Sequence, residues 1–237
     1  MLNFDRKTLF IILGVMILMN ILLGGRSIEG ILYALPGVIV AMTFHEFAHA
    51  WVATKLGDET PRLQGRLTLN PLNHIDPVGL ICLVLLGFGW GKPVQITPRN
   101  FDGKYSLSKA EAIVAAAGPI MNFIIAFIFL IILAIFGLKT TIITTTTKTI
   151  YSILLSIITV NLGLGVFNLI PIYPLDGSKV LNHFLPYKAK EWIINNQLVL
   201  TIIVFFIVFY TDVIPYISTY ILTGMTWIVN LIIGLFI

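Results

Sequence analysis

Long apolar segments alternate with short polar ones along the chain, and this pattern predicts a bundle of membrane-spanning helices. An apolar helix of about 20 residues is long enough to cross a hydrocarbon core about 30 Å thick. Six segments are predicted to span: 8–23, 31–56, 109–137, 149–170, 192–210 and 213–237. The predicted fold class is an all-α membrane protein, a six-transmembrane-helix bundle.

A shorter apolar element, residues 78–88, lies between the second and third predicted spans. It is too short to cross comfortably as a helix, so we predict a re-entrant or interfacial hairpin, with a spanning segment as the alternative. Residues 66–69 and 94–97 alternate apolar with polar side chains and are predicted as short strands.

Composition supports a membrane protein and excludes an ordinary soluble domain. Hydrophobic residues make up 57% of the 237 positions and charged residues 11%, against about 25% in soluble domains. Mean hydropathy is +0.95. No polar stretch is long enough for a second domain, so residues 1–237 are expected to form one transmembrane domain. The first apolar segment lacks a small-residue exit and is expected to be a span, not a cleaved signal peptide.

The basic residues predict the orientation in the membrane. With the N-terminus in the cytoplasm and residues 78–88 returning to the side they entered from, twelve of the fifteen Lys and Arg residues face the cytoplasm. Only Arg26, Lys139 and Lys148 lie outside. Both termini are therefore expected in the cytoplasm of a multi-pass cell-membrane protein. The net charge of +4 is interpreted as this topology signal, not as nucleic-acid binding.

The second predicted span contains a candidate metal site. Residues 44–51 read Phe-His-Glu-Phe-Ala-His-Ala-Trp. His45 and His49 are four apart and share one face of a helix, where two imidazoles can bind one Zn²⁺. Glu46 can take a proton from a zinc-activated water and pass it to a leaving amine. Two histidines and a glutamate in a bilayer are costly unless coordinated, which favours the metal over plain packing.

The predicted orientation places this motif at depth. His45 lies about 16 Å from the cytoplasmic end of its span, at 1.5 Å per residue. The active site is therefore expected inside the bilayer, toward the cytoplasmic side.

A second candidate cluster follows the fourth predicted span. Pro171 and Pro174 end the helix, and Asp176 follows at the turn. A catalytic zinc usually has three protein ligands plus water, so Asp176 is the expected third ligand. A plain turn or helix-cap role is its alternative. Asn168 is expected to bind substrate or a developing oxyanion, with interhelical hydrogen bonding as the alternative.

Several other polar residues leave two interpretations open. His74 is either a spare ligand or, more simply, a surface histidine. Asn122 and Asn161 are expected to hydrogen-bond between helices. The segment around Gly89, Trp90, Lys92 and Val94 is either a plain interfacial loop or an edge that receives an extended substrate by β-addition. Cys82 is the single cysteine, so no intrachain disulfide forms.

Together these motifs resemble the site-2 protease family of intramembrane zinc metalloproteases, in its short prokaryotic branch without PDZ or CBS domains. The resemblance covers the core, residues 31–187, and leaves the spans at 8–23, 192–210 and 213–237 peripheral. Its motifs are His-Glu-Phe-Ala-His at 45–49, Asn168 with Leu-Asp-Gly at 175–177, Arg-Leu-Thr-Leu-Asn-Pro at 66–71, His-Ile-Asp-Pro at 74–77, Gly-Trp-Gly-Lys-Pro at 89–93, and Ala-Gly-Pro at 117–119 with Asn122.

The resemblance implies one Zn²⁺ per chain, held by His45, His49 and Asp176, with Glu46 as catalytic acid and base. It also implies cleavage in or near a transmembrane segment of another membrane protein, as in regulated intramembrane proteolysis. Two rivals are weighed: a metal transporter, disfavoured because no internal repeat is seen, and a non-catalytic chaperone on the same fold, disfavoured because Glu46 is intact. The expected partners are a transmembrane substrate and the bilayer, and homo-oligomerisation stays open.

Overall fold

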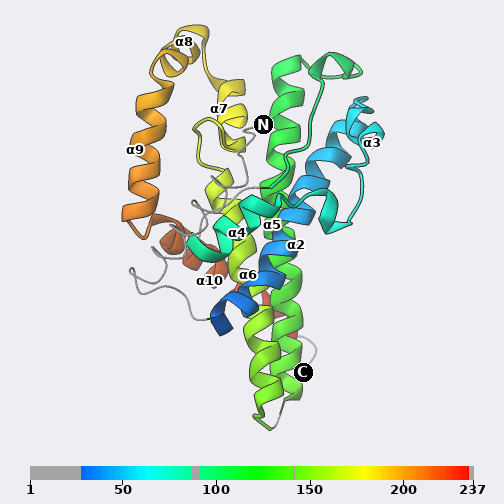
Figure 1. Ribbon diagram of the computed structural model, residues 1–237, viewed down its shortest axis with the longest axis vertical. Coiled ribbons are helices and arrows are strands. Elements are labelled where there is room, and N and C mark those ends of the chain that lie inside the picture. Colours follow the sequence, from blue (N-terminus) through cyan, green and yellow to red (C-terminus); the bar gives the residue numbers. More distant parts are fainter. Residues whose placement is uncertain (1–27, 87–90, 141, 235–237) are drawn as a thin grey trace, which may run out of the picture.

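The computed structural model describes residues 28–86, 91–140 and 142–234, and its regular structure is helical throughout these ranges (Figure 1). The four long helices are α2 (Ile28–Lys55), α5 (Leu107–Lys139), α6 (Thr145–Asn168) and α10 (Val213–Gly234). The shorter helices are α3 (Thr60–Leu63), α4 (Pro77–Leu86), α7 (Asp176–Phe184), α8 (Tyr187–Asn195) and α9 (Gln197–Tyr210), with 3₁₀ turns at Pro71–Asn73 and Pro98–Asn100.

The predicted all-helical membrane fold is confirmed in its main part. The four long helices are each long and apolar enough to cross a membrane, and α8 with α9 forms a bent pair that counts as a fifth candidate. The predicted span at 8–23 lies outside the described residues. The predicted span at 192–210 is not one straight helix, because α8 and α9 meet at 75° around Asn196. The Asn196 side chain donates to the carbonyl of Trp192 and helps to end α8 there.

The predicted hairpin and strands are not found in the described ranges. Residues 66–69 and 94–97 form no strand, and the one pairing between these loops is an isolated bridge from Ile75 to Gly91. The apolar element is instead helix α4, about 15 Å long and too short to span. The local sequence explains the helix. Proline is favoured in the first helical position, which Pro77 takes, and the Asp76 carboxylate caps the helix by accepting a hydrogen bond from the Gly79 N–H.

Helices α2, α5 and α6 pack against one another and form the centre of the molecule, while α7 packs on α5 and α10 on α6. In Figure 1, α2 crosses the long helix α5 obliquely, and α9 stands apart from this bundle. The largest apolar cluster joins α5, α6 and α10 through fully buried side chains such as Ala126, Ile158 and Val229. The bundle therefore holds the middle of α2 between two other helices.

The outer face of α5 is suited to lipid. Five isoleucines at helical spacing are each more than 40% exposed, although their side chains are strongly apolar: Ile120, Ile124, Ile128, Ile132 and Ile135. A stripe of this kind would be an aggregation hazard in water and is normal against acyl chains. The exposed side chains thus agree with the hydropathy of the helix.

Asp58, in the loop that follows α2, is a fully buried carboxylate that binds two other loop segments through hydrogen bonds. One of its oxygens accepts from the Thr60 N–H and the Asn100 side-chain amide, at 3.1 and 3.0 Å, and the other accepts from the Thr97 N–H at 2.7 Å. Burial alone would raise the pKa of Asp58, but a hydrogen bond from the Thr60 hydroxyl at 2.5 Å, together with the three above, outweighs burial and lowers the pKa below its usual value. Asp58 therefore joins the loop after α2 to the 97–100 turn.

We expect Asp58 to make stability depend on pH. A carboxyl with a lowered folded-state pKa stabilises the fold fully above its unfolded pKa of about 3.9 and loses that contribution as the pH falls toward the folded value. Asp58→Asn should lower the apparent melting temperature at pH 7, because an amide now faces N–H donors, at a cost of about 1–3 kcal/mol. It should also flatten the decline between pH 5 and 3, measured in detergent. Asp102→Asn, at an exposed loop carboxylate, is the control and should change neither.

Candidate metal centre

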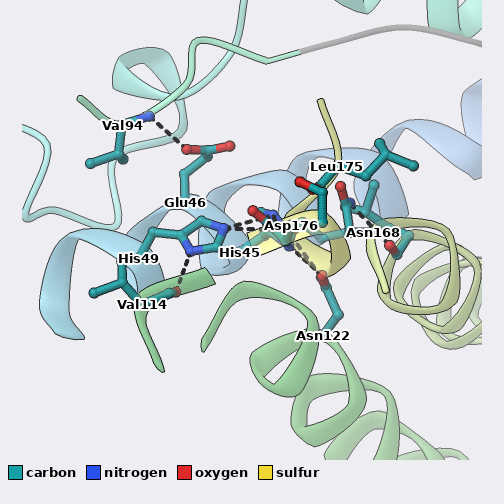
Figure 2. Close-up of polar contacts among 12 residues, drawn as sticks. His45, Glu46, His49, Val94, Val114, Asn122, Asn168, Leu175 and Asp176 are labelled. Atoms are coloured by element: carbon teal, nitrogen blue, oxygen red, sulfur yellow. Dashed lines mark hydrogen bonds and ion pairs between the residues drawn. The ribbon is translucent and has the colours of Figure 1, made fainter. Parts of the chain in front are cut away.

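Helix α2 presents two histidine rings into the centre of the bundle, as the spacing predicts. His45 and His49 are 6% and 7% exposed, and their Nε2 atoms are 3.0 Å apart (Figure 2). One helical turn separates their Cα atoms, so both rings leave the same face. The two Nε2 atoms therefore point toward one shared position.

Asp176 reaches the same position from α7. The chain leaves α6 at Asn168, turns through Pro171 and Pro174, and starts α7 at Asp176 itself. Its Oδ2 lies 3.2 Å from the Nε2 of each histidine. Gly177 permits this approach, since a Cβ there would collide with the backbone of Leu169 at the end of α6. The structure thus brings Asp176 together with two histidines that lie more than 120 residues earlier in the sequence.

The outer ring nitrogens show which histidine atoms are free to bind a cation. His49 Nδ1 lies 2.7 Å from the Val114 carbonyl oxygen, which can only accept, so this nitrogen carries the proton. His45 Nδ1 lies 2.7 Å from Asn122 Oδ1. In neutral rings protonated on Nδ1, both Nε2 atoms carry lone pairs.

Three electron-pair donors consequently converge on one point. The two Nε2 atoms and the Asp176 carboxylate oxygen lie within 4.8 Å of one another. Such atoms repel unless a positive charge lies between them, and two imidazoles with one carboxylate form a ligand set typical of catalytic zinc. The residues present therefore fit a zinc ion.

Gly118 of α5 makes room for this cluster. A Cβ at this position would collide with His49 Nε2 and would lie 2.6 Å from His45 Cε1. Gly118 thus forms one wall of the site, where only a hydrogen atom fits. Pro119 follows it without interrupting α5, which runs as one helix from Leu107 to Lys139.

Glu46 is half-buried beside the histidines and lines the same cavity. Its Oε2 accepts a hydrogen bond of 2.9 Å from the Val94 N–H, and Figure 2 shows the side chain extended toward that segment. The contact ties residues 91–97 to the motif on α2. A carboxylate next to a cation site is able to accept and return a proton.

The comparisons with known proteins agree with this chemistry. The model of peptidase family M50 matches residues 135–210, which include Asp176. YwhC of Bacillus subtilis (strain 168), provisionally named a zinc metalloprotease, is 40% identical over 158 residues, 65% of this chain and 69% of YwhC. The chain belongs to peptidase family M50, the site-2 protease family.

Relatives of lower identity match shorter portions. Rip2 of Mycolicibacterium smegmatis, also provisionally named a zinc metalloprotease, is 31% identical over 99 residues, 40% of this chain and 38% of Rip2. Zinc metalloprotease MJ0392 of Methanocaldococcus jannaschii is 26% identical over 151 residues, 64% of this chain and 34% of MJ0392. No solved structure matches the chain significantly. Zinc as the cofactor of this M50 member, predicted from the sequence, is confirmed by the family.

The M50 site opens into a cavity of about 740 Å³. Its walls are mostly apolar and come from α2, α6, the 91–96 segment and the α9–α10 end, with Phe205, Val208 and Ile214 among them. Asn168 lines this cavity from the last turn of α6, and its Nδ2 donates to the Leu164 carbonyl at 3.1 Å. The cavity is therefore large enough for several residues of an extended peptide.

Of the residues predicted to contact a substrate strand, the structure describes Lys92 and Val94. Val94 lines the cavity, and Lys92 N donates to the His74 carbonyl at 2.8 Å, which fixes the start of this segment. Gly89 and Trp90 lie outside the described residues. Both interpretations of His74 were wrong: it is fully buried, outside the ligand cluster, and its Nε2 lies 2.7 Å from the Thr68 carbonyl oxygen.

Three residues at the centre were not predicted in these roles. Gly118 was interpreted as a packing residue, Asn122 as a bond between helices, and Val114 was not singled out. Each acts through a tertiary contact with the histidines, and the short spacing from Gly118 to Asn122, one turn of one helix face, was the available signal.

Proposed function

We propose that this M50 protein is an intramembrane zinc metalloprotease of the site-2 type, which hydrolyses a peptide bond within or near a transmembrane segment of another membrane protein. The observation that carries the proposal is the position of the donor cluster. His45 and His49 lie on a helix that qualifies as a membrane span and face a largely apolar cavity. Such a cavity suits an apolar peptide better than a polar solute.

We propose His45, His49 and Asp176 as the ligands and Glu46 as the catalytic acid and base. When bound, zinc supplies a Lewis acid that polarises a carbonyl and makes a water molecule acidic near neutral pH. A free oxygen of the Glu46 carboxylate takes the proton from that water. The same oxygen then returns a proton to the leaving amine nitrogen, so that Glu46 ends the cycle as it began.

The substrate must be extended at the cut. A transmembrane helix hides its carbonyls in its own hydrogen bonds, so it has to unwind before one can enter the cavity. The segment that contains Lys92 and Val94 would align the unwound peptide, and we propose the same role for Gly89 and Trp90. Asn168 would donate from its amide to a substrate carbonyl, or to the oxyanion that develops from it. Helix-breaking residues near the cut should therefore favour cleavage.

The orientation proposed from the basic residues completes this function. Both termini lie in the cytoplasm, and the site lies within the bilayer toward the cytoplasmic side. Residues 1–237 act as a single proteolytic domain. The expected physiological role is regulated intramembrane proteolysis, in which a membrane-tethered protein is released into the cytoplasm.

Zinc content tests whether the two halves of the site act together. We expect about one zinc per chain in the purified protein, and Asp176→Ala should reduce this strongly because two imidazoles alone hold the ion weakly. The measurement is metal analysis after dialysis against a weak chelator. Asp212→Ala, at an exposed acid between α9 and α10, is the control and should retain full zinc. Unchanged zinc in Asp176→Ala would contradict the proposed ligand set.

The activity is tested with a defined membrane substrate. Two single-span substrates are reconstituted with the protein in liposomes. One has a Gly-Pro pair in the cytoplasmic half of its span, and the other has only leucines there. We expect mass spectrometry to locate a cut inside the Gly-Pro span, with slower cleavage of the leucine version. If only soluble loops were cut, whatever the span sequence, the intramembrane proposal would be wrong.

A further inference from the structure

We propose that Asn122 and Asn161 are positioning residues of the metal centre: their side chains form a directed relay of hydrogen bonds that fixes the protonated nitrogen and the orientation of His45. The inference rests on the proposed ligand set, since it concerns how one ligand is presented to zinc. It gives a functional role to two amides that would otherwise be explained as bonds between helices.

The relay crosses three helices. His45 of α2 meets Asn122 of α5 at 2.7 Å, and Asn122 Nδ2 donates to Asn161 Oδ1 of α6 at 3.0 Å. Both asparagines are 0% exposed and lie in helices that qualify as membrane spans. In such surroundings a polar side chain is retained only where its hydrogen bonds are satisfied.

Backbone carbonyls give the relay its direction. Asn122 Nδ2 lies 3.0 Å from the Ala41 carbonyl oxygen, which cannot donate, so the amide nitrogen must face Ala41 and Asn161. The oxygen of Asn122 must then face His45. An oxygen in that place requires the proton of His45 on Nδ1, and leaves the lone pair of Nε2 for the metal.

Asn161 is oriented by the same argument. Its Nδ2 donates to the Ile157 carbonyl at 2.8 Å, so its oxygen faces Asn122. Every bond in the series therefore points one way, from His45 to Asn122, then to Asn161, and finally to a backbone carbonyl. Linking the three helices would need only the bonds from Asn122 to Ala41 and to Asn161, and the further bond to His45 indicates the second role.

The two histidines differ in how they are held. His49 is oriented by a backbone carbonyl, that of Val114, which no substitution removes. His45 is oriented by side chains alone at this nitrogen, so its geometry depends on the identity of residue 122. Groups behind a ligand usually change metal affinity by about 10- to 100-fold when they are replaced. Zinc affinity can therefore be altered through His45 by substituting residue 122, with all three proposed ligands left in place.

The test compares Asn122→Leu, Asn161→Ala and the double variant with the unaltered full chain in detergent. Zinc affinity is measured by competition with a chromophoric chelator, and the coordination of Co²⁺ in place of zinc by visible absorption. Melting temperature is recorded for each metal-free protein. The matched control is Thr159→Val, because the Thr159 hydroxyl on α6 bonds only within its own helix, to Leu155 and Ser156.

We expect Asn122→Leu to weaken zinc binding by about 10- to 100-fold and to change the Co²⁺ spectrum. Asn161→Ala should weaken it less, because Asn122 keeps its bond to Ala41, and should add nothing in the Asn122→Leu background. The Thr159→Val protein should bind as the unaltered chain does.

Unaltered zinc affinity and Co²⁺ spectrum in a folded Asn122→Leu protein would overturn the proposal. So would additive effects of the two substitutions, which indicate separate structural roles. If Asn122→Leu fails to fold, Asn161→Ala decides: folded protein with unaltered affinity overturns the relay. Failure of the proposed function looks different, since the unaltered chain would then bind zinc without cleaving, or would bind it as tightly after His45→Ala.

Discussion

Replacing Glu46 by glutamine is expected to stop peptide hydrolysis while one zinc ion remains bound. Glutamine has nearly the same shape and can still meet the Val94 N–H through its oxygen, but it cannot take up a proton. Loss of a general acid and base typically costs about 10²- to 10⁴-fold in rate. The measurement is cleavage of the liposome substrate with Gly-Pro in its span, together with zinc analysis of the same sample.

The control for this substitution lies on the same helix. Glu29→Gln changes an exposed carboxylate in the first turn of α2, whose contact is the Tyr33 hydroxyl, and should leave cleavage unaltered. The result also separates the rival functions. If the Glu46→Gln protein retains zinc and does not cleave, the result supports the protease. If it cleaves normally, Glu46 is not the base. If it loses the transport of an ion instead of cleavage, the result supports the metal transporter.

Gly118→Ala is expected to weaken zinc binding strongly through a single methyl group. The added Cβ would occupy space held by the rings of His45 and His49. The rings cannot move away without breaking their hydrogen bonds to Asn122 and to the Val114 carbonyl. We expect zinc affinity to fall by at least about 10-fold, comparable with the loss of a group that orients a ligand, and cleavage to fall with it. Chelator competition and the cleavage assay measure the two effects.

Gly137→Ala provides a matched control on the same helix. Among the described residues, no atom outside the adjoining backbone of α5 lies within 4 Å of a Cβ built at Gly137, so the Gly137→Ala protein should bind zinc normally. Since alanine favours helix over glycine by about 1 kcal/mol, Gly137→Ala should leave stability unchanged or raise it slightly. Equal zinc affinity in the two variants would show that the site tolerates a side chain at 118, contrary to the structure.

The parts of this molecule that could be predicted from the sequence are those set by local periodicity. His45, Glu46 and His49 follow from the spacing of a single helix turn. The end of α6 at Asn168 follows from the prolines after it. The meeting with Asp176 is a tertiary contact, and it became a prediction because a catalytic zinc needs a third ligand and because residues 175–177 resemble a motif of the family.

The errors arose where local pattern and environment disagree. Residues 94–97 alternate like a strand, yet no neighbouring strand is present in the described ranges, and the Val94 N–H bonds to Glu46 instead. Asn196 lies inside an apolar segment, where average hydropathy hides a single break. His74 bonds to a backbone carbonyl, a partner that no sequence pattern identifies.

The ligand set also links parts of the fold that are far apart in the sequence. His45 and His49 belong to the central bundle, whereas Asp176 opens a short helix that reaches them only after a proline-rich turn. Ligation by all three would act as a cross-link between distant chain segments, and a ligand that binds only the folded state stabilises it by mass action. Metal-depleted protein should therefore lose order first around the start of α7, which makes the catalytic ion a structural clamp as well.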